Sequence, residues 1–506
     1  MAERLKATVL KTVVPTGTGG SNPSCSVMSF ANNEAEQSAE SGQIYRLSHR
    51  AGCSKAKRQA AHFQRMKMTF VFDLLYFIAA ILISPVLLYR MVRHKRYRAG
   101  WANRFGKICR KSPDKKSIWI HAVSLGEINA VKTLVNELDK LPGFEIVISS
   151  TTDTGFTRAK ELYGSKFTVI YFPFDLSFIM KRAFANLNPA ICILVELEIW
   201  PNLVGIANRK NIPVVVVNGR IGNKSYPKYR AFRPVVKKIF QGITLTLAQS
   251  PEYAQRFIQL GAKADRVIVA GSLKYDTAQI ADKVEGADRL AEGLNIRKDQ
   301  RLFVAGGTGD GEEKIILEVY KKIVSQEKFR DLRLAVIPRK PERFDEVDNL
   351  IRQGSFESIR YSKIKNKTLN VANQSSINAV ILGDTMGDLR KFYSLASLIF
   401  VGRSLVPMGG SDMAEAAALG KCTIFGPYTF NFNQTARDLL EDKGAIQVKN
   451  NLELSEAIEK CLDEPGYARE IARSGQNVIR KNQGATKKTA GEIKAILAGQ
   501  ASSIRV

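Results

Sequence analysis

Charged side chains stand directly after three predicted strands in the first half of the chain. Glu127, in HAVSLGE, follows a Gly126 bend and begins a predicted helix, whose N-terminal dipole favours a carboxylate that can act as a base. Glu196 and Glu198, in VELEIWPN, end an apolar strand, where unpaired buried charge is costly. Lys274, in VAGSLKYD, can meet an anionic ligand group. The pattern indicates proton transfer and anion binding. The alternatives are a helix-start carboxylate without a catalytic role for Glu127, a structural ion pair for Glu196 and Glu198, and a solvated side chain for Lys274.

Glycine-containing turns after strands of the second half offer backbone amides to a phosphate. The segment 303–313, FVAGGTGDGEE, lacks the third glycine of a dinucleotide fingerprint and the Gly-Lys-Ser/Thr of a P-loop, which weakens the NAD and ATP hypotheses. Near Gly409 and Gly410, Glu415 begins a small-residue helix, where a carboxylate can accept both hydroxyls of a ribose. Any one of these segments can be a plain tight turn. Three of them in one domain favour a nucleotide site: 337–344, 383–393 and 402–432.

Short apolar segments alternate with helical patterns throughout the body of the chain. Uninterrupted β-branched runs such as Val214–Val217 are typical of strands buried on both faces, hence of parallel sheets. Two doubly wound α/β domains are therefore predicted, facing each other across a cleft at the carboxyl ends of their strands. The expected strands are 117–123, 144–150, 167–174, 190–197, 212–219, 245–250, 301–307, 332–338, 379–384, 396–402 and 422–426.

Composition narrows the class of protein. The 506 residues include 45% hydrophobic and 25% charged residues, which excludes a mainly disordered, collagenous or multi-span chain. The 76 Lys and Arg exceed the 48 Asp and Glu by 28, which indicates an anionic partner. Without zinc-finger, helix-turn-helix or RNP signatures, an acidic membrane surface is favoured over nucleic acid. The 6 cysteines form no CxxC pair, which argues against metal-finger and disulfide scaffolds and fits a reducing compartment.

One apolar segment is long enough to cross a bilayer. Thr69–Tyr89 carries a single charge, Asp73, over 21 residues, and Arg90–Ser117 then carries 11 Lys and Arg against one Asp. A membrane-anchor helix over 66–92 is predicted, with the catalytic body on the cytoplasmic side; a buried helix of a soluble domain is the alternative. Residues 1–65 lack periodicity and are expected to be disordered.

The order of the motifs carries a family resemblance. SLGE, TTDTG, FPFD, ELEIWPN, NGRI, GSLKYD, PRKPERF, GDTMGDL and GGSDMAEAAALGK…FGPYTFNF follow one another between about Phe70 and Lys481. This set resembles the bacterial 3-deoxy-D-manno-octulosonic acid (Kdo) transferases, glycosyltransferase family 30. The resemblance implies a GT-B fold of two Rossmann-like domains. It also implies inverting transfer of Kdo from CMP-Kdo to the lipid A precursor, lipid IV-A, in lipopolysaccharide core biosynthesis at the cytoplasmic face of the inner membrane, with no metal or other cofactor.

The resemblance also assigns residue roles. Glu127 matches the family's catalytic base, and Glu196 and Lys274 match positions that stabilise the transition state. The matched CMP-binding positions are Pro338, Arg339, Met386, Gly387, Asp388, Asp412, Met413, Ala414 and Glu415. Three departures concern the donor: Ser411 and Asp412 replace the His and Asn of the family's GGHN, Lys340 replaces a His, and the glycine-rich loop lacks a His near Gly309.

The expected domains follow from these assignments. They are a disordered extension (1–65), the anchor helix (66–92), an acceptor-binding Rossmann-like domain (93–276), a linker (277–300), a CMP-sugar-binding Rossmann-like domain (301–485) and a C-terminal tail (486–506). Two other functions stay open: a GT-B transferase that uses a UDP-sugar with a membrane acceptor, and a membrane-tethered nucleotide-binding protein that has lost catalysis.

Overall fold

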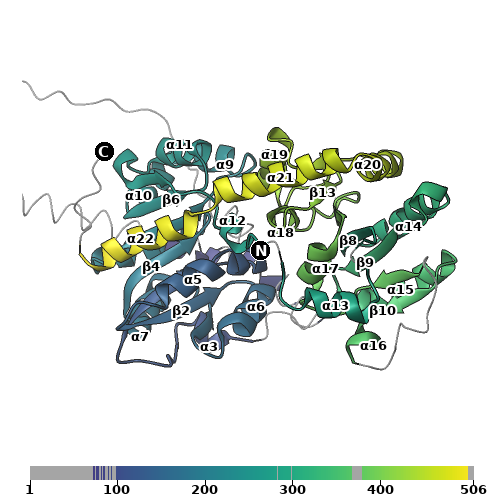
Figure 1. Cartoon of the computed structure of the whole chain (residues 1–506). Helices are drawn as coiled ribbons and strands as arrows, with labels where there is room; N and C mark the ends of the chain where they lie inside the picture. Colours follow the sequence, from purple (N-terminus) through teal and green to yellow (C-terminus); the bar gives the residue numbers. More distant parts are fainter. Residues whose placement is uncertain are drawn as a thin grey trace, which may run out of the picture. The chain divides into compact units, whose positions relative to one another are not determined.

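A computed structural model describes residues 99–281, 283–297, 299–366 and 379–499, together with scattered helical residues between Phe72 and Arg93 (Figure 1). The described chain forms two compact units. Unit 1 runs to Gly271 and resumes at Thr486, whereas unit 2 is Ser272–Ala485. The predicted anchor helix, 66–92, lies mostly outside the described residues. Within the described part of the chain, no helix combines the length and apolar character that a bilayer crossing needs.

Unit 1 is built on a seven-stranded sheet with the order β3-β2-β1-β4-β5-β6-β7, in which all neighbouring strands are parallel. Its strands are β1 (Lys116–His121), β2 (Phe144–Ser150), β3 (Thr168–Tyr171), β4 (Pro189–Val195), β5 (Val214–Gly219), β6 (Leu245–Ala248) and β7 (Val267–Val269). The run Val214–Val217 is completely buried, as expected for a strand that is covered by helices on both faces.

Helices cover both faces of this sheet. One face packs on α7, α8, α10 and α11, while α6 packs on β2 and β3. The helices of unit 1 are α3 (Trp101–Arg104), α4 (Leu125–Ala130), α5 (Lys132–Leu138), α6 (Asp153–Tyr163), α7 (Ser177–Leu187), α8 (Pro201–Arg209), α9 (Tyr226–Ala231), α10 (Arg233–Phe240), α11 (Pro251–Leu260) and α22 (Ala485–Leu497).

Unit 2 repeats this architecture with the strand order β10-β11-β9-β8-β12-β13-β14, again entirely parallel. Its strands are β8 (Leu302–Thr308), β9 (Arg333–Pro338), β10 (Ser358–Arg360), β11 (Val380–Leu382), β12 (Leu398–Val401), β13 (Cys422–Phe425) and β14 (Ile446–Gln447). One core joins the sheet to α13, α17, α18, α19 and α21, and the other joins it to α14, α15 and α20.

The helices of unit 2 complete the doubly wound pattern. They are α12 (Leu273–Thr277), α13 (Ala287–Gly293), α14 (Glu312–Val324), α15 (Phe344–Gln353), α16 (Tyr361–Lys365), α17 (Leu389–Leu395), α18 (Met413–Ala418), α19 (Asn433–Glu441), α20 (Asn451–Asp463) and α21 (Pro465–Asn482). The prediction of two parallel-sheet α/β domains is therefore confirmed.

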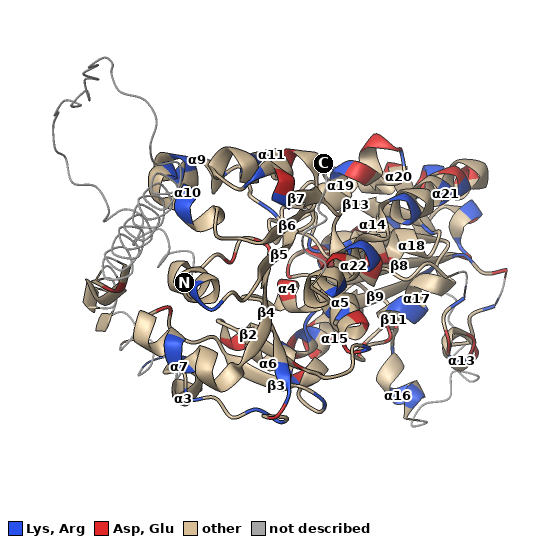
Figure 2. Cartoon of the chain, turned by 90° about the vertical axis from the view of Figure 1, so that its left-hand side faces the viewer, with Lys and Arg blue, Asp and Glu red and all other residues tan. Residues whose placement is uncertain are grey.

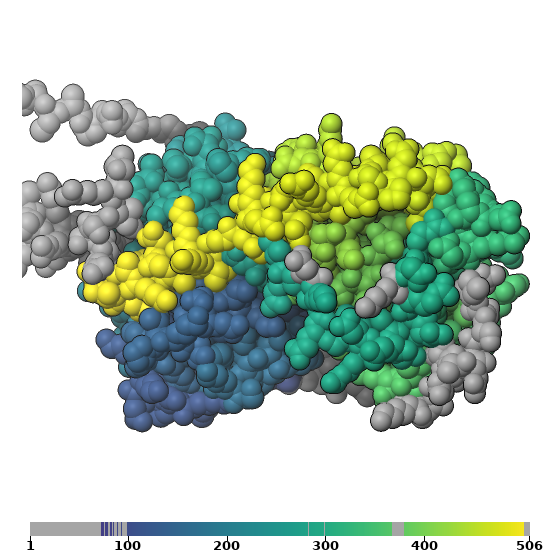
Figure 3. All heavy atoms as spheres, viewed as in Figure 1, coloured from purple at the N-terminus to yellow at the C-terminus, as the bar shows by residue number. Residues whose placement is uncertain are grey.

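Local differences from the sequence prediction have simple causes. The edge strands β10 and β14 span only two or three residues, too few to give a readable pattern, whereas the strand expected before Lys274 is the three-residue edge strand β7. The helix expected from Glu127 is two helices that meet at Val131. The expected linker contains α13, and the expected tail contains α22, which returns to unit 1 through a Thr133–Thr486 hydrogen bond of 2.8 Å. Figure 3 shows the yellow atoms of α22 against the blue atoms of unit 1.

Candidate active site

Each sheet has one point where its strand order reverses. In unit 1 this point lies between β1 and β4, because α8 packs on the opposite face from α4. In unit 2 it lies between β8 and β12. The loops that leave two adjacent parallel strands in opposite directions open a crevice at their carboxyl ends, and ligands of doubly wound folds bind there. Glu127 follows β1 and Glu196 follows β4, so both lie at the reversal point of unit 1.

Glu127 is held by the start of its own helix. Ser124 is the N-cap of α4, and its hydroxyl oxygen accepts the Glu127 N–H at 3.3 Å. In return, the Glu127 carboxylate accepts the Val123 N–H at 2.8 Å and the Ser124 hydroxyl at 2.9 Å. This reciprocal capping box fixes the carboxylate at the sheet edge. The helix begins at Leu125, so the predicted Gly126 bend is instead part of its first turn.

The electrostatics of Glu127 differ from the expectation. Burial, followed by the charges of Glu196 and Glu198, raises the pKa of Glu127 to about 8, although the Val123 N–H and the Ser124 hydroxyl oppose the shift. The expected effect of the helix start was to favour the carboxylate. It is outweighed because two like charges share a site with little water. The structure therefore brings the three carboxylates together, and Glu127 is a stronger base than an ordinary glutamate once it is deprotonated.

Glu196 and Glu198 lie in the segment directly after β4, which ends at Val195. The Glu196 N–H donates to the Val217 carbonyl at 2.9 Å, which continues the ladder between β4 and β5 by one bond. Its backbone is left-handed, with φ of 58°. A non-glycine residue in this conformation costs about 1–3 kcal/mol, so the surrounding contacts must enforce the turn that carries both carboxylates.

Lys274 belongs to unit 2, where it lies in the short helix α12. Its ammonium group lies 5.7 Å from the centre of the Phe432 ring. Burial raises the pKa of Asp412, and the Ala414 N–H and the charges of Lys274 and Arg339 oppose that shift. Burial and the Asp412 charge raise the pKa of Glu415 to about 7. Two carboxyl groups and two cations thus gather around the start of α18, where Asp412 is the N-cap and accepts the Ala414 N–H at 3.0 Å.

The other matched positions of unit 2 differ in what they can offer a ligand. Pro338 is buried at the end of β9, and Arg339 is exposed beside it. Met386 is 63% exposed. By contrast, Met413 and Ala414 are buried, so only their backbone is available to a ligand.

The Asp388 carboxylate binds neighbouring side chains of unit 2. Its carboxylate pairs with Lys365 at 2.7 Å and with Lys391 at 2.8 Å, and it accepts the Thr385 hydroxyl at 2.7 Å. Burial alone raises the pKa of Asp388, but these hydrogen bonds outweigh it and hold the pKa at about 2. Asp388 therefore fixes the turn that presents Met386 and Gly387, whose φ is 89°.

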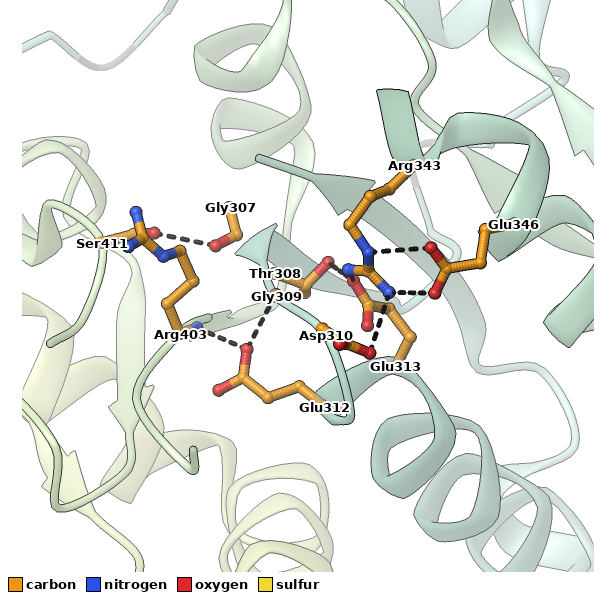
Figure 4. Close-up of polar contacts among 10 residues, drawn as sticks. All are labelled: Gly307, Thr308, Gly309, Asp310, Glu312, Glu313, Arg343, Glu346, Arg403 and Ser411. Atoms are coloured by element: carbon orange, nitrogen blue, oxygen red, sulfur yellow. Dashed lines mark hydrogen bonds and ion pairs between the residues drawn. The ribbon is translucent and has the colours of Figure 1, made fainter. Parts of the chain in front are cut away.

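Sequence reasoning missed a buried carboxylate that organises unit 2. Glu312 is fully buried at the start of α14 and accepts backbone N–H groups from both loops at the reversal point (Figure 4). The donors are Gly309 at 3.1 Å, Ser404 at 2.7 Å, Leu405 at 2.8 Å and Arg403. Burial raises the pKa of Glu312, and these four N–H groups oppose the shift. The only signal in the sequence was an acidic pair after a glycine-rich turn, which is also the pattern of an ordinary exposed helix start.

The neighbouring Glu313 ties the glycine-rich loop to the segment after β9. Its carboxylate accepts the Thr308 hydroxyl at 2.8 Å and the Arg343 guanidinium at 2.7 Å (Figure 4). On the other side of the loop, the Ser411 hydroxyl donates to the Gly307 carbonyl at 2.8 Å. Ser411 stands where the resembled family has a histidine, and here it joins the glycine-rich loop to the start of α18. Among the described residues, no three His, Cys, Asp or Glu side chains are grouped as metal ligands.

Glu198→Gln is expected to lower the pKa of Glu127 from about 8, because one of the two neighbouring negative charges is removed. The measurement is a carboxyl-carbon NMR titration of protein labelled in glutamate. Glu161→Gln, an exposed glutamate paired with Arg158, is the matched control and is expected to leave the titration unchanged. An unaltered Glu127 titration in Glu198→Gln would show that the carboxylates are not coupled.

Glu312→Gln is expected to lower the free energy of unfolding by about 2 kcal/mol or more, because an amide cannot accept all four buried N–H groups. Urea unfolding followed by circular dichroism measures the change. Glu318→Gln, on the exposed side of the same helix α14, is the control and is expected to stay within about 0.5 kcal/mol of the parent protein. Equal stabilities of the two variants would contradict this role for Glu312.

Comparison with known proteins gives a consistent result. Residues 99–277 match the family model described as 3-deoxy-D-manno-octulosonic-acid transferase (kdotransferase). The chain is 32% identical over 409 residues to a 3-deoxy-D-manno-octulosonic acid transferase of Haemophilus influenzae, covering 80% of this chain and 93% of that protein.

Two further similarities concern only part of a relative or only the fold. A bifunctional glycosyltransferase/methyltransferase of Fusobacterium nucleatum is 35% identical over 362 residues, which is 71% of this chain but 54% of the relative, so the chain spans about half of that protein. A crystal structure of a glycosyltransferase from Rickettsia africae superimposes with a TM-score of 0.50 at 14% identity, covering 76% of this chain and 99% of that one. At that identity the likeness concerns the fold alone.

Proposed function

Because the chain belongs to the 3-deoxy-D-manno-octulosonic acid transferase family, a family of glycosyltransferases, we propose that it moves Kdo from CMP-Kdo to the lipid A precursor, lipid IV-A, in lipopolysaccharide core biosynthesis. The observation that carries the proposal is the position of Glu127. A buried carboxyl group, with a pKa raised to about 8, lies at the reversal point of unit 1 and is fixed by a capping box. A general base for a sugar hydroxyl needs this combination of position and basicity.

The proposed reaction is a single displacement that inverts the anomeric carbon. The attacking hydroxyl oxygen of the acceptor forms a bond to the anomeric carbon, the bond from that carbon to the CMP phosphate oxygen breaks, and CMP leaves with the electron pair. Glu127 takes the hydroxyl proton, a contribution of about 10²–10⁴-fold in rate. Glu196 shares the site of Glu127 and supports its basicity through like charge. No metal ion or other cofactor takes part in the proposed steps.

Unit 2 supplies the proposed binding groups for CMP-Kdo. Asp412 and Glu415 offer carboxyl oxygens that can accept the ribose hydroxyls, with Arg339 among the charges beside them. Lys274 and the backbone amides at the start of α18 would stabilise negative charge as it develops on the phosphate.

The remaining matched positions would shape the CMP site. Pro338 sets the end of β9, and Met386 and Gly387 form an exposed turn that Asp388 holds in place. Met413 and Ala414 contribute backbone only.

Charge supports an acceptor in an anionic membrane. Residues 226–240, which form α9 and α10 of unit 1, contain Lys228, Arg230, Arg233, Lys237 and Lys238 and no acidic residue (Figure 2). Clustered cations of this kind attract phosphorylated lipids. Together with the apolar stretch Thr69–Tyr89 and the basic run after it, they favour a single N-terminal anchor that attaches the chain to the inner membrane, with both units on the cytoplasmic side. Asp73 and Tyr76 of that stretch contact unit 1 and therefore lie on the same side.

The test of the proposal is conversion of lipid IV-A. Purified full-length protein, incubated in detergent micelles with CMP-Kdo and lipid IV-A, is expected to yield a lipid whose mass increases by one or more Kdo residues. Free CMP is expected to inhibit the reaction more strongly than UDP. Product formation from a UDP-sugar alone would instead support the UDP-sugar transferase. Binding of CMP-Kdo without any product would support the inactive nucleotide-binding protein.

Glu127→Gln is expected to lower kcat by about 10²–10⁴-fold with little change in KM for CMP-Kdo, because the amide cannot accept the hydroxyl proton. Steady-state transfer kinetics measure the effect. Glu137→Gln, a half-exposed glutamate on the adjacent helix α5 that pairs with Lys140, is the control and is expected to behave like the parent protein. Transfer at a near-normal rate by Glu127→Gln would remove Glu127 from the role of base.

A further inference from the structure

The apolar segment that precedes unit 1 places its one acidic residue inside that unit. Asp73 is the single charged residue of Thr69–Tyr89. Its carboxylate accepts the Ser177 N–H at 2.8 Å, the Ser177 hydroxyl at 2.5 Å and the Asn202 side-chain amide at 3.0 Å. Ser177 is the first residue of α7, and the N-cap residue of that helix, Leu176, provides no side-chain hydrogen bond. Asp73 therefore takes the place of the missing cap.

Asp175 supports the neighbouring helix in the same way. Its carboxylate, which is almost fully buried, accepts the Asn202 N–H at 2.9 Å and the Leu203 N–H at 2.8 Å, both in the first turn of α8. Trp200, the N-cap of α8, forms no capping hydrogen bond with its side chain. The Tyr76 hydroxyl from the apolar segment donates to Asp175 at 3.1 Å. The segment therefore supplies one of the two carboxylates, Asp73, and contacts the other, Asp175.

The two carboxylates converge on Asn202. Its backbone N–H donates to the Asp175 carboxylate, and its side-chain amide donates to the Asp175 backbone carbonyl and to the Asp73 carboxylate. Asn202 is 2% exposed and stands six residues after Glu196, at the end of the turn that carries Glu196 and Glu198. The other end of that turn is fixed by the bond from Glu196 N–H to Val217. The turn is short, so moving Asn202 moves the two glutamates as well.

We infer that Asp73, Asp175 and Asn202 form a clamp through which the apolar segment positions Glu196 and Glu198 beside Glu127. The segment would then do more than attach the protein to a membrane, because its docking sets the geometry of the acidic cluster. Asp73 and Asp175 are positioning residues that act through Asn202 and do not touch a substrate. The expected effect on kcat rests on the function proposed above. The expected effect on the hydrogen exchange of the turn that carries Glu196 and Glu198 can be measured without it.

Full-length Asp73→Ala in detergent micelles tests the clamp, because neither the variant nor the parent protein is then attached to a bilayer. Loss of the half-buried Asp73 carboxylate, which binds Ser177 through two hydrogen bonds and Asn202 through one, is expected to lower kcat for Kdo transfer about tenfold, with KM for CMP-Kdo unchanged. Asp73→Asn, which keeps one acceptor oxygen, is expected to recover part of the rate. Asp265→Ala, an exposed aspartate of the same unit, is the control.

A second measurement does not depend on activity. Hydrogen–deuterium exchange of residues 196–203 is expected to be about tenfold faster in Asp73→Ala, since Asn202 loses its hydrogen bond to Asp73 and keeps only those to Asp175. Tyr76→Phe, which removes only the hydroxyl bound to Asp175, is expected to give a smaller change in the same direction and keeps the test valid if Asp73→Ala folds poorly.

The inference is overturned if Asp73→Ala and Tyr76→Phe both keep the parent kcat and the parent exchange rate of residues 196–203 in micelles. A defect that appears only with lipid vesicles would also overturn it, because the segment would then serve attachment alone. If the parent protein forms no product from CMP-Kdo, the proposed function fails, and the exchange rates still decide whether the clamp exists.

Discussion

Repulsion between three half-buried carboxylates is the constraint on which unit 1 depends. Glu127 follows β1, Glu196 and Glu198 follow β4, and the two strands are neighbours at the reversal point of a parallel sheet. Burial, followed by the charges of Glu196 and Glu198, raises the pKa of Glu127 to about 8. This arrangement is unfavourable by itself, so the structure must enforce it. The capping box holds Glu127, the ladder to β5 holds Glu196, and Asn202 holds the end of the glutamate turn.

Unit 2 places a carboxylate at the equivalent point and gives it a different environment. Glu312 lies at the reversal point between β8 and β12 and accepts four backbone N–H groups, which fix the two loops together. A carboxylate surrounded by amide donors is well suited to a structural role, whereas one surrounded by other carboxylates is well suited to proton transfer. Asp412 ends the loop after β12 as the N-cap of α18, and Glu415 lies in the first turn of that helix, where both can meet a ligand.

The sequence predicted the parts of this protein that depend on local pattern. Apolar runs located the long strands of both sheets to within a few residues, and strand ends located Glu127, Glu196, Lys274 and Glu415. The direction of the Glu127 pKa was wrong, because a helix-dipole argument takes no account of burial or of the charges that the fold brings from the end of β4, three strands later in the sequence. The role of Asp73 was also out of reach, because its partner Ser177 lies 104 positions away.

The buried carboxylate of Glu312 shows a further limit of sequence reasoning. Acidic residues at a helix start are usually exposed, and only the packing of the 403–405 loop makes this one structural. Likewise, matching Asp388 by position predicted a ligand contact, while its ion pairs with Lys365 and Lys391 indicate that it supports the turn before it. A residue type at a given spacing identifies a candidate, but the partners that the fold supplies determine what that candidate does.

The pH dependence of kcat/KM for Kdo transfer tests the central claim most directly, because this ratio reports the ionisation of groups in the free enzyme. If Glu127 is the base and the crowded carboxylates set its basicity, kcat/KM of the full-length protein will rise with pH and level off above about 8, and the residual activity of Glu127→Gln will show no such rise. The same rise in Glu127→Gln, or a profile of the parent protein that is already level at pH 6, well below that pKa, would contradict the account.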